Sequence, residues 1–330
     1  MKHSLRITAP SRLHFGLLRL AQPAGRSYGG LGMMIDRPRV VVELSPAERW
    51  SASGPSAQRA QQFARRAFAS CSAPPIRAVR IEVIEAPDPH TGLGSGTQLA
   101  LAVAAGVREL CQAPARTIDE LAASVDRGGR SAVGSHGFEL GGLLWERGRL
   151  PHQTLGELQG RVEVPAAWRA VLATFPQLEG LSGEMESRAF ERLPPVPTAI
   201  TQRLARLAEE QILPTAENDD FDAFATAVYE YGHLAGSCFA TVQGGPFASP
   251  RIAAAVQRLR AMGVSGVGQS SWGPTIYAFA PHEETALELI DRLESLEELA
   301  DAQLNYSPPN NRGALLETGS SRTAVGYSKP

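Results

Sequence analysis

A glycine-rich stretch at residues 89–98, Pro-His-Thr-Gly-Leu-Gly-Ser-Gly-Thr-Gln, constrains the fold more than any other part of the chain. Before it, alternating apolar and polar residues at 79–84 predict a half-buried strand. After it, Leu99, Val103 and Val107 recur at helical spacing, and Thr97 is placed to cap the first turn. A strand, a glycine loop and a helix N-terminus present backbone N–H groups and the positive helix end to an anion. The stretch therefore predicts either a phosphate site or, more simply, a glycine turn before a core helix.

Two common phosphate motifs do not match this stretch. A Walker A loop ends in Gly-Lys-Ser/Thr, whereas the corresponding residues here are Gly96-Thr97-Gln98. The dinucleotide fingerprint is G-x-G-x-x-G, whereas this string is G-x-G-x-G without the required acidic residue further on. The stretch is therefore neither an ordinary nucleotide loop nor a dinucleotide site.

Composition narrows the class of protein. The 330 residues suffice for two domains with cores of their own. The 32 basic and 34 acidic residues nearly balance, which argues against a nucleic-acid partner or an anionic membrane surface. We find no apolar segment long enough to span a bilayer, no signal-peptide core at residues 1–6, and three scattered cysteines. We expect a cytoplasmic protein with reduced thiols.

Lysine is confined to Lys2 and Lys329. Schiff-base chemistry and lysine-assisted phosphoryl transfer are therefore unfavoured. A bound phosphate must be held by backbone amides, hydroxyls, a metal ion or the forks of arginine side chains. General replacement of lysine by arginine in the genome explains the composition equally well, but the chemical consequence is the same.

The chain changes character near residue 162. We predict an N-terminal domain over 1–162 with the phosphate loop at 90–98. We predict a C-terminal α+β domain over 163–330 with a glycine loop at 263–274 and a loosely packed tail at 305–330. The first strand is expected to break at Pro10, and residues 126–139 to form a loop rich in small residues and arginine. Further expected elements are strands at 40–44, 170–175 and 275–279, and helices at 57–71, from 118, 184–193, 198–212, 219–234, 251–262 and 283–296.

Three glycine-rich motifs at these intervals resemble the GHMP kinase superfamily, named for galactokinase, homoserine kinase, mevalonate kinase and phosphomevalonate kinase. Its first motif falls on 9–16, its phosphate loop on 92–96 and its third motif on 263–273. The resemblance implies an α+β fold of two domains, the first like domain 2 of ribosomal protein S5 and the second ferredoxin-like. It also implies an active site between them.

This sequence differs from the kinase pattern in three places. Arg12 occupies the place of a lysine, Gly96 that of a serine that often binds magnesium, and no carboxylate lies near Gly134, where many kinases have a general base. A kinase must orient the acceptor hydroxyl and balance the charge of the transferring phosphate. The departures together disfavour phosphoryl transfer.

One branch of the superfamily fits better. The motifs at 11–16, 25–32, 90–98, 129–131 and 268–274 together resemble the β-ribofuranosylaminobenzene 5′-phosphate synthases. That resemblance implies joining phosphoribosyl pyrophosphate to 4-aminobenzoate, or 4-hydroxybenzoate, with release of CO2 and pyrophosphate, in tetrahydromethanopterin biosynthesis. It further implies a homodimer that uses Mg²⁺ and no organic cofactor.

The expected site follows from these motifs and from residue chemistry. The predicted catalytic residues, which contact phosphate or carboxylate or assist the reaction, are Arg12, His14, Arg26, Asp36 and Arg130. The predicted substrate- and phosphate-binding residues are His90, Gly92, Gly94, Ser95, Gly96, Thr97, Gln98, Ser131, Gln269, Ser270 and Ser271. The expected magnesium or ribose ligands are Asp36 and Glu139.

Plainer interpretations remain open for several of these residues. Arg12 and Asp36 could form a structural ion pair, and His14 could be a packed strand residue. Trp272 could stack on the aromatic acid or pack in a core. His90 and His136 flank glycine loops, so their protonation is expected to follow pH in the working range.

Two other functions stay open at this point. The chain could be a sugar or polyol kinase whose base comes from elsewhere, such as Glu139 or Asp36. It could also be a non-catalytic sensor that binds a phosphate ligand on the same fold. ATP consumption that depends on a sugar or polyol, without release of pyrophosphate, would indicate the kinase. Stabilisation by the ligand without turnover would indicate the sensor.

Overall fold

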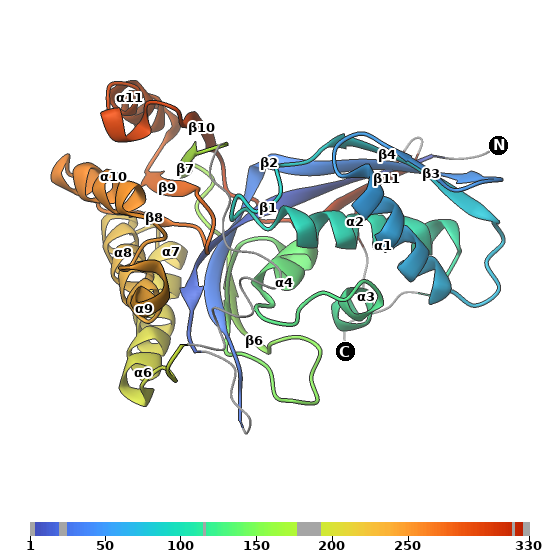
Figure 1. The fold of residues 1–330 in the computed structure, drawn as a ribbon, viewed down its shortest axis with the longest axis horizontal. Helices are drawn as coiled ribbons and strands as arrows, with labels where there is room; N and C mark the ends of the chain where they lie inside the picture. Colours follow the sequence, from blue (N-terminus) through green and yellow to red (C-terminus); the bar gives the residue numbers. More distant parts are fainter. Residues whose placement is uncertain (1–3, 20–24, 115–116, 177–192, 319–320, 326–330) are drawn as a thin grey trace.

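The computed structural model describes residues 4–19, 25–114, 117–176, 193–318 and 321–325. Its strands form two sheets, each packed against helices (Figure 1), so the predicted α+β class is confirmed. The eight-stranded sheet runs in the order β12-β11-β1-β2-β4-β3, with β5 pairing β2 and β6 pairing β5. Its strands are β1 (Leu5–Leu17), β2 (Gly30–Ala47), β3 (Ser51–Ser53), β4 (Ala78–Glu85), β5 (Leu143–Glu146), β6 (Leu158–Val162), β11 (Leu315–Thr318) and β12 (Ser321–Ala324).

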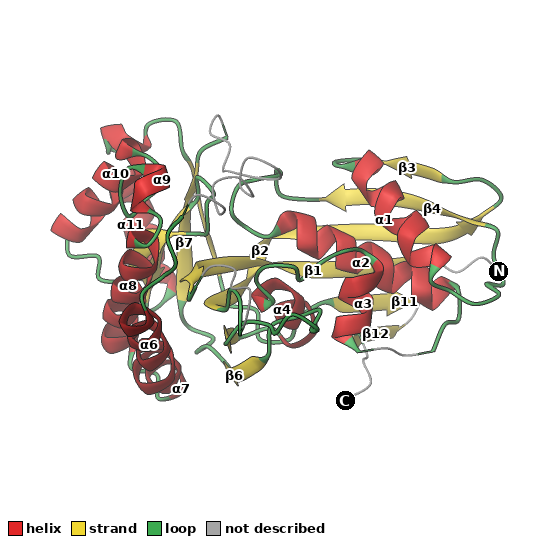
Figure 2. Cartoon of the chain, turned by 60° about the horizontal axis from the view of Figure 1, so that its bottom comes forward, coloured by secondary structure: helices red, strands yellow, loops and turns green. Residues whose placement is uncertain are grey.

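Helices cover one face of this large sheet, as Figure 2 shows. They are α1 (Ala57–Ala69), α2 (Ser95–Leu110), α3 (Ile118–Ser124) and α4 (Val133–Leu140). The central one is α2, whose apolar residues pack against β1, β2 and β4 in a single core. Gly106 lets α2 lie directly on the sheet, because an added Cβ would come within 2.6 Å of Leu44 Cδ1. The prediction of a core helix after the glycine loop is confirmed.

The second sheet has the order β10-β7-β9-β8. Its strands are β7 (Arg169–Thr174), β8 (Val267–Gln269), β9 (Ile276–Ala280) and β10 (Gln303–Ser307). The helices around it are α6 (Thr198–Arg206), the π-helix η1 (Leu207–Ile212), α7 (Leu213–Glu217), α8 (Phe221–Ser237), α9 (Ala240–Gln243), α10 (Pro250–Ala261), α11 (Glu283–Leu293) and the 3₁₀ turn η2 (Glu297–Leu299). One apolar core joins the two halves, since Phe15 of β1 packs on Tyr277 and Phe279 of β9. This shared core fixes the end of β1 against the second sheet.

Three local predictions about the first half were wrong. The first strand does not break at Pro10, because a register shift between Ala9 and Ser11 absorbs that residue within β1. Thr97 does not cap α2: the N-cap residue is Gly94, and Thr97 lies inside the first turn. Residues 133–140 form α4 rather than a loop. Gly137 makes that helix possible, because a Cβ there would lie 2.2 Å from Met34 Sδ on β2.

The predicted loose tail at 305–330 was also wrong over its described part. β10 extends the second sheet beside β7, and β11 pairs antiparallel with β1 in the first. The chain therefore returns to the N-terminal sheet after crossing the second one, so β11 and β12 do not belong to the domain to which we assigned them. The predicted helix at 184–193 falls almost entirely outside the described residues.

Candidate active site

A large cavity opens where β1, the start of α2, α1 and two glycine-rich loops meet. Its empty space is about 1510 Å³ counted out to the open mouth. We call it the arginine cavity, and its lining residues are Arg12, His14, Leu17, Arg59, His90, Gly92, Gly94, Ser95, Gly96, Thr97, Asp126, Arg127, Gly128, Gly129, Arg130, Ser131, Ser271, Trp272 and Gly273. Most residues predicted from the three motifs therefore face one space.

Backbone hydrogen bonds hold β1 between the two glycine loops. Arg12 N donates to Leu93 O (2.9 Å), and Ser271 N donates to His14 O (2.9 Å). The buried Ser270 hydroxyl links all three segments, because it accepts from His14 N (3.0 Å) and donates to Gly92 O (2.7 Å). Ser270 thus holds the loops together and does not line the arginine cavity.

The two loops touch through glycine. Gly92 has φ +85°, and a Cβ on it would lie 2.2 Å from Ser270 O. A Cβ on Gly273 would lie 2.2 Å from Gly92 N. No side chain fits between these backbones, so glycine at both positions is a condition for the loops to meet.

The start of α2 offers backbone donors to the cavity. Gly94 is the N-cap residue with φ +72°, and the first intrahelical bonds run from Thr97 N and Gln98 N to Gly94 O. The N–H groups of Ser95 and Gly96 come before those bonds, at the positive end of a 16-residue helix. This is the arrangement that binds phosphates at helix N-termini.

Four arginines line the cavity around this loop: Arg12, Arg59, Arg127 and Arg130. Arg59 was not predicted. Its Nη2 lies 2.9 Å from the point where a Cβ of Gly96 would stand, so its guanidinium packs against the phosphate loop itself. Burial, and next the nearby charge of Arg59, lower the pKa of Arg127. The cavity thus gathers positive charge that a polyanion would neutralise.

His14 is buried, and its Nε2 shares a 3.0 Å hydrogen bond with Ser131 Oγ. Burial, and then the charge of Arg12, hold the His14 pKa well below its ordinary value. The ring is therefore neutral in the working range and acts as a hydrogen-bonding group, not as a cation for phosphate.

A carboxylate that sequence reasoning missed lies behind Ser131. Glu146 is fully buried at the end of β5, accepts from Ala132 N (3.0 Å) and Gly148 N (2.9 Å), and also bonds the Ser131 hydroxyl. Burial raises its pKa to about 7. Glu146 fixes the 129–132 loop that carries Arg130 and Ser131. A glutamate at a strand end carries no sequence signal for such a role.

The structure places several predicted residues outside the arginine cavity. Arg26 pairs with Glu157 (2.5 Å) and donates to Gly148 O (2.8 Å). Asp36 accepts from Asn310 Nδ2 (2.7 Å), so its carboxylate bonds to an amide. Both polar groups are engaged in structural contacts, and neither residue is among those that line the cavity.

Three more of the predicted residues also serve the framework. Gln98 is buried and donates to Gly134 O (2.8 Å). Gln269 accepts from Ala248 N (2.8 Å) and donates to Ser271 O (2.9 Å), which shapes the second glycine loop. Glu139 lies on α4 with its pKa raised by burial, away from the lining residues.

His136 lies outside the cavity lining, and its Nε2 is 2.8 Å from Gly156 O. Burial lowers its pKa, so the ring loses its proton at a lower pH than an ordinary histidine. His90, in contrast, lines the cavity with a left-handed backbone (φ 66°).

The residues of the cavity do not fit a magnesium ion held by the protein. Mg²⁺ prefers oxygen ligands, usually one or two carboxylates together with phosphates. The described lining residues include one carboxylate, Asp126, whose side chain is 92% exposed and 3.9 Å from Arg66. The described residues contain no cluster of three or more His, Cys, Asp or Glu that could hold a metal.

Comparisons with known proteins agree with this geometry. The sequence matches the GHMP kinases N-terminal domain over residues 57–139 and the GHMP kinases C-terminal domain over 212–298, together just over half of the chain. Among solved structures, homoserine kinase from Cytophaga hutchinsonii superposes with a TM-score of 0.70 at 15% identity, covering 96% of this chain and 98% of that one. Mevalonate-3-kinase from Thermoplasma acidophilum superposes with a TM-score of 0.64 at 13% identity, covering 96% and 99%.

This two-domain fold with a glycine loop at a helix N-terminus defines a class, and the chain belongs to the GHMP kinase superfamily. Within it, the chain is similar to proteins named beta-ribofuranosylphenol 5′-phosphate synthase. The relative from Archaeoglobus fulgidus is 28% identical over 95% of this chain and 99% of its own length. That from Methanocaldococcus jannaschii is 24% identical over 87% and 93%. The predicted resemblance is thereby confirmed, with a phenol in the relatives' name where we expected an aminobenzene.

The described residues contain no helix suited to crossing a membrane.

Proposed function

We propose that the protein is a synthase that joins the ribose 5-phosphate unit of phosphoribosyl pyrophosphate to a 4-substituted benzoate, releasing CO2 and pyrophosphate. The observation that carries the proposal is the cavity with four arginines and the amides of a helix N-terminus, beside one described carboxylate. Such a site suits a substrate with a pyrophosphate and a second phosphate. The names of the relatives support a ribosyl phosphate product.

The reaction balances without an oxidant or an organic cofactor. The bond from the sugar C1 to the pyrophosphate oxygen breaks, and pyrophosphate takes the electron pair. The ring carbon that bears the carboxylate forms a new bond to C1. Loss of CO2 then returns an electron pair to the ring and restores aromaticity. The nucleophile is an electron-rich ring carbon, so no base has to deprotonate a hydroxyl for the attack.

In this scheme, the site's main task is to stabilise the departing pyrophosphate. The amides of Ser95 and Gly96 and the guanidinium of Arg59 meet at the phosphate loop, where the negative charge develops. One lost donor of this kind costs about 3–4 kcal/mol of barrier in enzymes that use the same principle. The cations for the 5-phosphate are Arg127 and Arg130, of which Arg130 lies on the loop fixed by Glu146. Arg12, whose charge helps to lower the pKa of His14, is the cation for the benzoate carboxylate.

The choice of acceptor, 4-aminobenzoate or 4-hydroxybenzoate, is the finer part of the proposal. Both carry an electron donor opposite the reacting carbon, so both activate it in the same way. The product would enter tetrahydromethanopterin biosynthesis, and we propose a cytoplasmic homodimer as its producer. The relatives' name favours 4-hydroxybenzoate for those proteins.

The test uses purified protein, phosphoribosyl pyrophosphate as its magnesium salt, and carboxyl-labelled 4-aminobenzoate or 4-hydroxybenzoate. Labelled CO2 and pyrophosphate should appear in equal amounts. Folded protein that releases neither between pH 5 and 8 overturns the proposal. ATP consumption that depends on a sugar or polyol would show a kinase instead. Stabilisation by phosphoribosyl pyrophosphate without turnover would show a sensor.

A further inference from the structure

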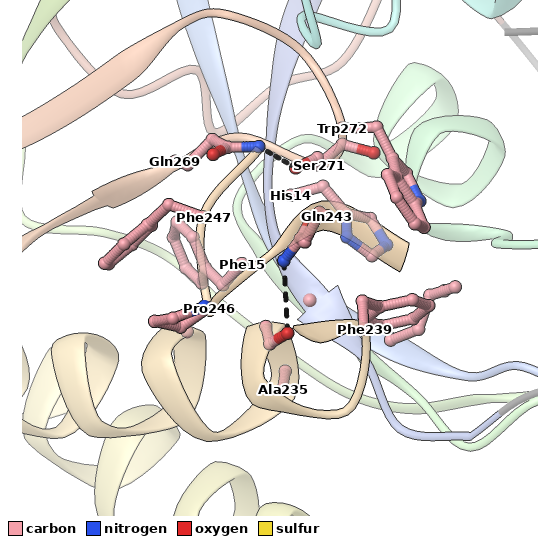
Figure 3. A pocket seen from close by; sticks show the side chains of 14 residues that line it. His14, Phe15, Ala235, Phe239, Gln243, Pro246, Phe247, Gln269, Ser271 and Trp272 are labelled. Atoms are coloured by element: carbon pink, nitrogen blue, oxygen red, sulfur yellow. Dashed lines mark hydrogen bonds between the residues drawn. The ribbon is translucent and has the colours of Figure 1, made fainter. Parts of the chain in front are cut away.

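A second, smaller cavity adjoins the arginine cavity (Figure 3). It lies between the end of β1, the last turns of α8, α9 and the 269–272 loop, with about 460 Å³ of empty space counted out to its mouth. We call it the apolar cavity. The two cavities share four lining residues, which are His14, Leu17, Ser271 and Trp272. A ligand that occupied both would therefore pass this common wall.

The walls of the apolar cavity are uncharged. Its described lining residues include no Lys, Arg, Asp or Glu. His14 is neutral there, since burial holds its pKa down. Burying a phosphate without a counter-charge is strongly unfavourable, whereas an apolar ring is favoured. The division of charge thus assigns phosphates to the first cavity and an apolar group to the second.

Aromatic side chains and closely packed backbone line the cavity. Phe239 and Trp272 pack edge to face with centroids 5.0 Å apart, and Trp272 is 8% exposed. On the other side, α8 lies directly on β1, because a Cβ on Gly16 would lie 2.4 Å from Ala235 Cβ. Backbone and aromatic edges therefore form the walls, as in sites that hold a single aromatic ring.

Two glutamines line this cavity, Gln243 and Gln269, and they differ in how their carboxamides are hydrogen-bonded. Gln269 uses both ends of its carboxamide, on Ala248 N and Ser271 O. Gln243 donates from Nε2 to Gly236 O (3.2 Å), as the dashed line in Figure 3 shows. Among the described contacts of Gln243, that bond leaves Oε1 as an acceptor for an N–H or O–H of a ligand.

Resting on the proposed function, we infer that the apolar cavity holds the benzene ring of the acceptor, with its para substituent facing Gln243 Oε1. The carbon that bears the carboxylate must reach the sugar C1, so it lies at the wall shared with the arginine cavity. The para position is the opposite end of the ring and therefore points away from the phosphates. A 4-hydroxyl or 4-amino group there donates to Gln243. Gln243 is thus the residue that selects para-substituted benzoates over benzoate.

The experiment compares wild type with Gln243→Leu, which keeps side-chain bulk and removes the acceptor oxygen. The dissociation constants of benzoate, 4-hydroxybenzoate and 4-aminobenzoate are measured by equilibrium dialysis. The wild type should prefer the para-substituted acids by about tenfold, the equivalent of one hydrogen bond. The preference should fall to near unity in Gln243→Leu, with the KM for phosphoribosyl pyrophosphate unchanged. Gln257→Leu, on the exposed face of α10, is the matched control and should keep the preference.

Phe239→Leu is the second variant, because it keeps an apolar wall without the ring. It should raise the KM for the acceptor and leave that for phosphoribosyl pyrophosphate unchanged. A full preference for para-substituted acids in Gln243→Leu, in protein that still releases CO2, overturns this inference and leaves the proposed function intact. Absence of CO2 release from the wild type overturns the proposed function, and the dialysis ratios still decide where benzoates bind.

Discussion

At the scale of single residues, Arg59 has the clearest consequence for the proposed chemistry. It belongs to α1, whereas the phosphate loop begins α2, yet its guanidinium fills the space beside Gly96. In the kinases that the sequence resembles, a serine stands at the position of Gly96. Here a fixed cation takes that space, which suits the binding of a leaving pyrophosphate.

We predict that Arg59→Gln raises the KM for phosphoribosyl pyrophosphate by tenfold or more. A hydrogen bond to a charged group is worth about 1.5–3 kcal/mol, which corresponds to roughly tenfold to a hundredfold in affinity. Arg65→Gln is the control, because Arg65 lies on the same helix but over the ring of Trp50 (5.0 Å). Steady-state kinetics measure the effect. Equal KM values for the two variants would remove Arg59 from the site.

At the scale of elements, the site depends on contact between two loops from distant parts of the chain. Gly92 precedes α2, and Gly273 precedes β9. Their backbones meet where neither residue can carry a side chain. The Ser270 hydroxyl joins the two loops directly, and β1 is hydrogen-bonded to each of them. The phosphate loop is therefore positioned by the second domain as well as by its own helix.

Gly92→Ala should abolish turnover and lower the free energy of unfolding by about 2–4 kcal/mol, because the new methyl overlaps Ser270 O in a left-handed backbone. The matched control is Gly263→Ala. Gly263 has φ +89°, but its Cβ would meet nothing within 4 Å, so only the backbone cost of about 1 kcal/mol applies. Urea denaturation and CO2 release measure both effects. Wild-type turnover in Gly92→Ala would show that the loops need not touch.

At the scale of the whole molecule, buried ionisable groups make stability depend on pH in opposing directions. The Glu146 pKa is raised by burial to about 7, so the folded state keeps a proton that the unfolded chain releases near pH 4.5. The contribution of protonated Glu146 to the free energy of unfolding is therefore largest below pH 4.5 and is lost as the pH rises to about 7. His14 and His136 have lowered pKa values, so they destabilise the fold as the pH falls below about 6.5.

The free-energy difference between wild type and Glu146→Gln should therefore change with pH. Relative to this variant, the wild type should lose about 3 kcal/mol of stability between pH 4.5 and 8, since one pKa unit is worth 1.36 kcal/mol. Urea denaturation at several pH values measures the difference. Glu109→Gln, an exposed site on α2, should show no such trend. A pH-independent difference for Glu146→Gln would place its ionisation outside this range.

The sequence by itself determined the elements with strong local signals. The glycine loop before α2 was predicted from the strand and helix periodicity on either side. The helices predicted from 118 and at 219–234 are present, the first with a capping box at Thr117 and Glu120 and the second with Asp220 as its cap. The three motifs also gave the family, and most of the residues named from them line one cavity.

Only the tertiary structure decided which polar groups face that cavity. The sequence predicted Arg26 and Asp36 as site residues and did not predict Arg59, because the local sequence around an arginine or a carboxylate does not show whether it meets a ligand or a partner. Glu157 and Asn310 engage the first two, and their contacts join residues more than a hundred positions apart. The pairing of β11 with β1 is likewise a long-range contact, and the sequence of a short strand does not indicate which partner it pairs with. The glycine loop thus identified an anion site, whereas the fold determined which cations surround it.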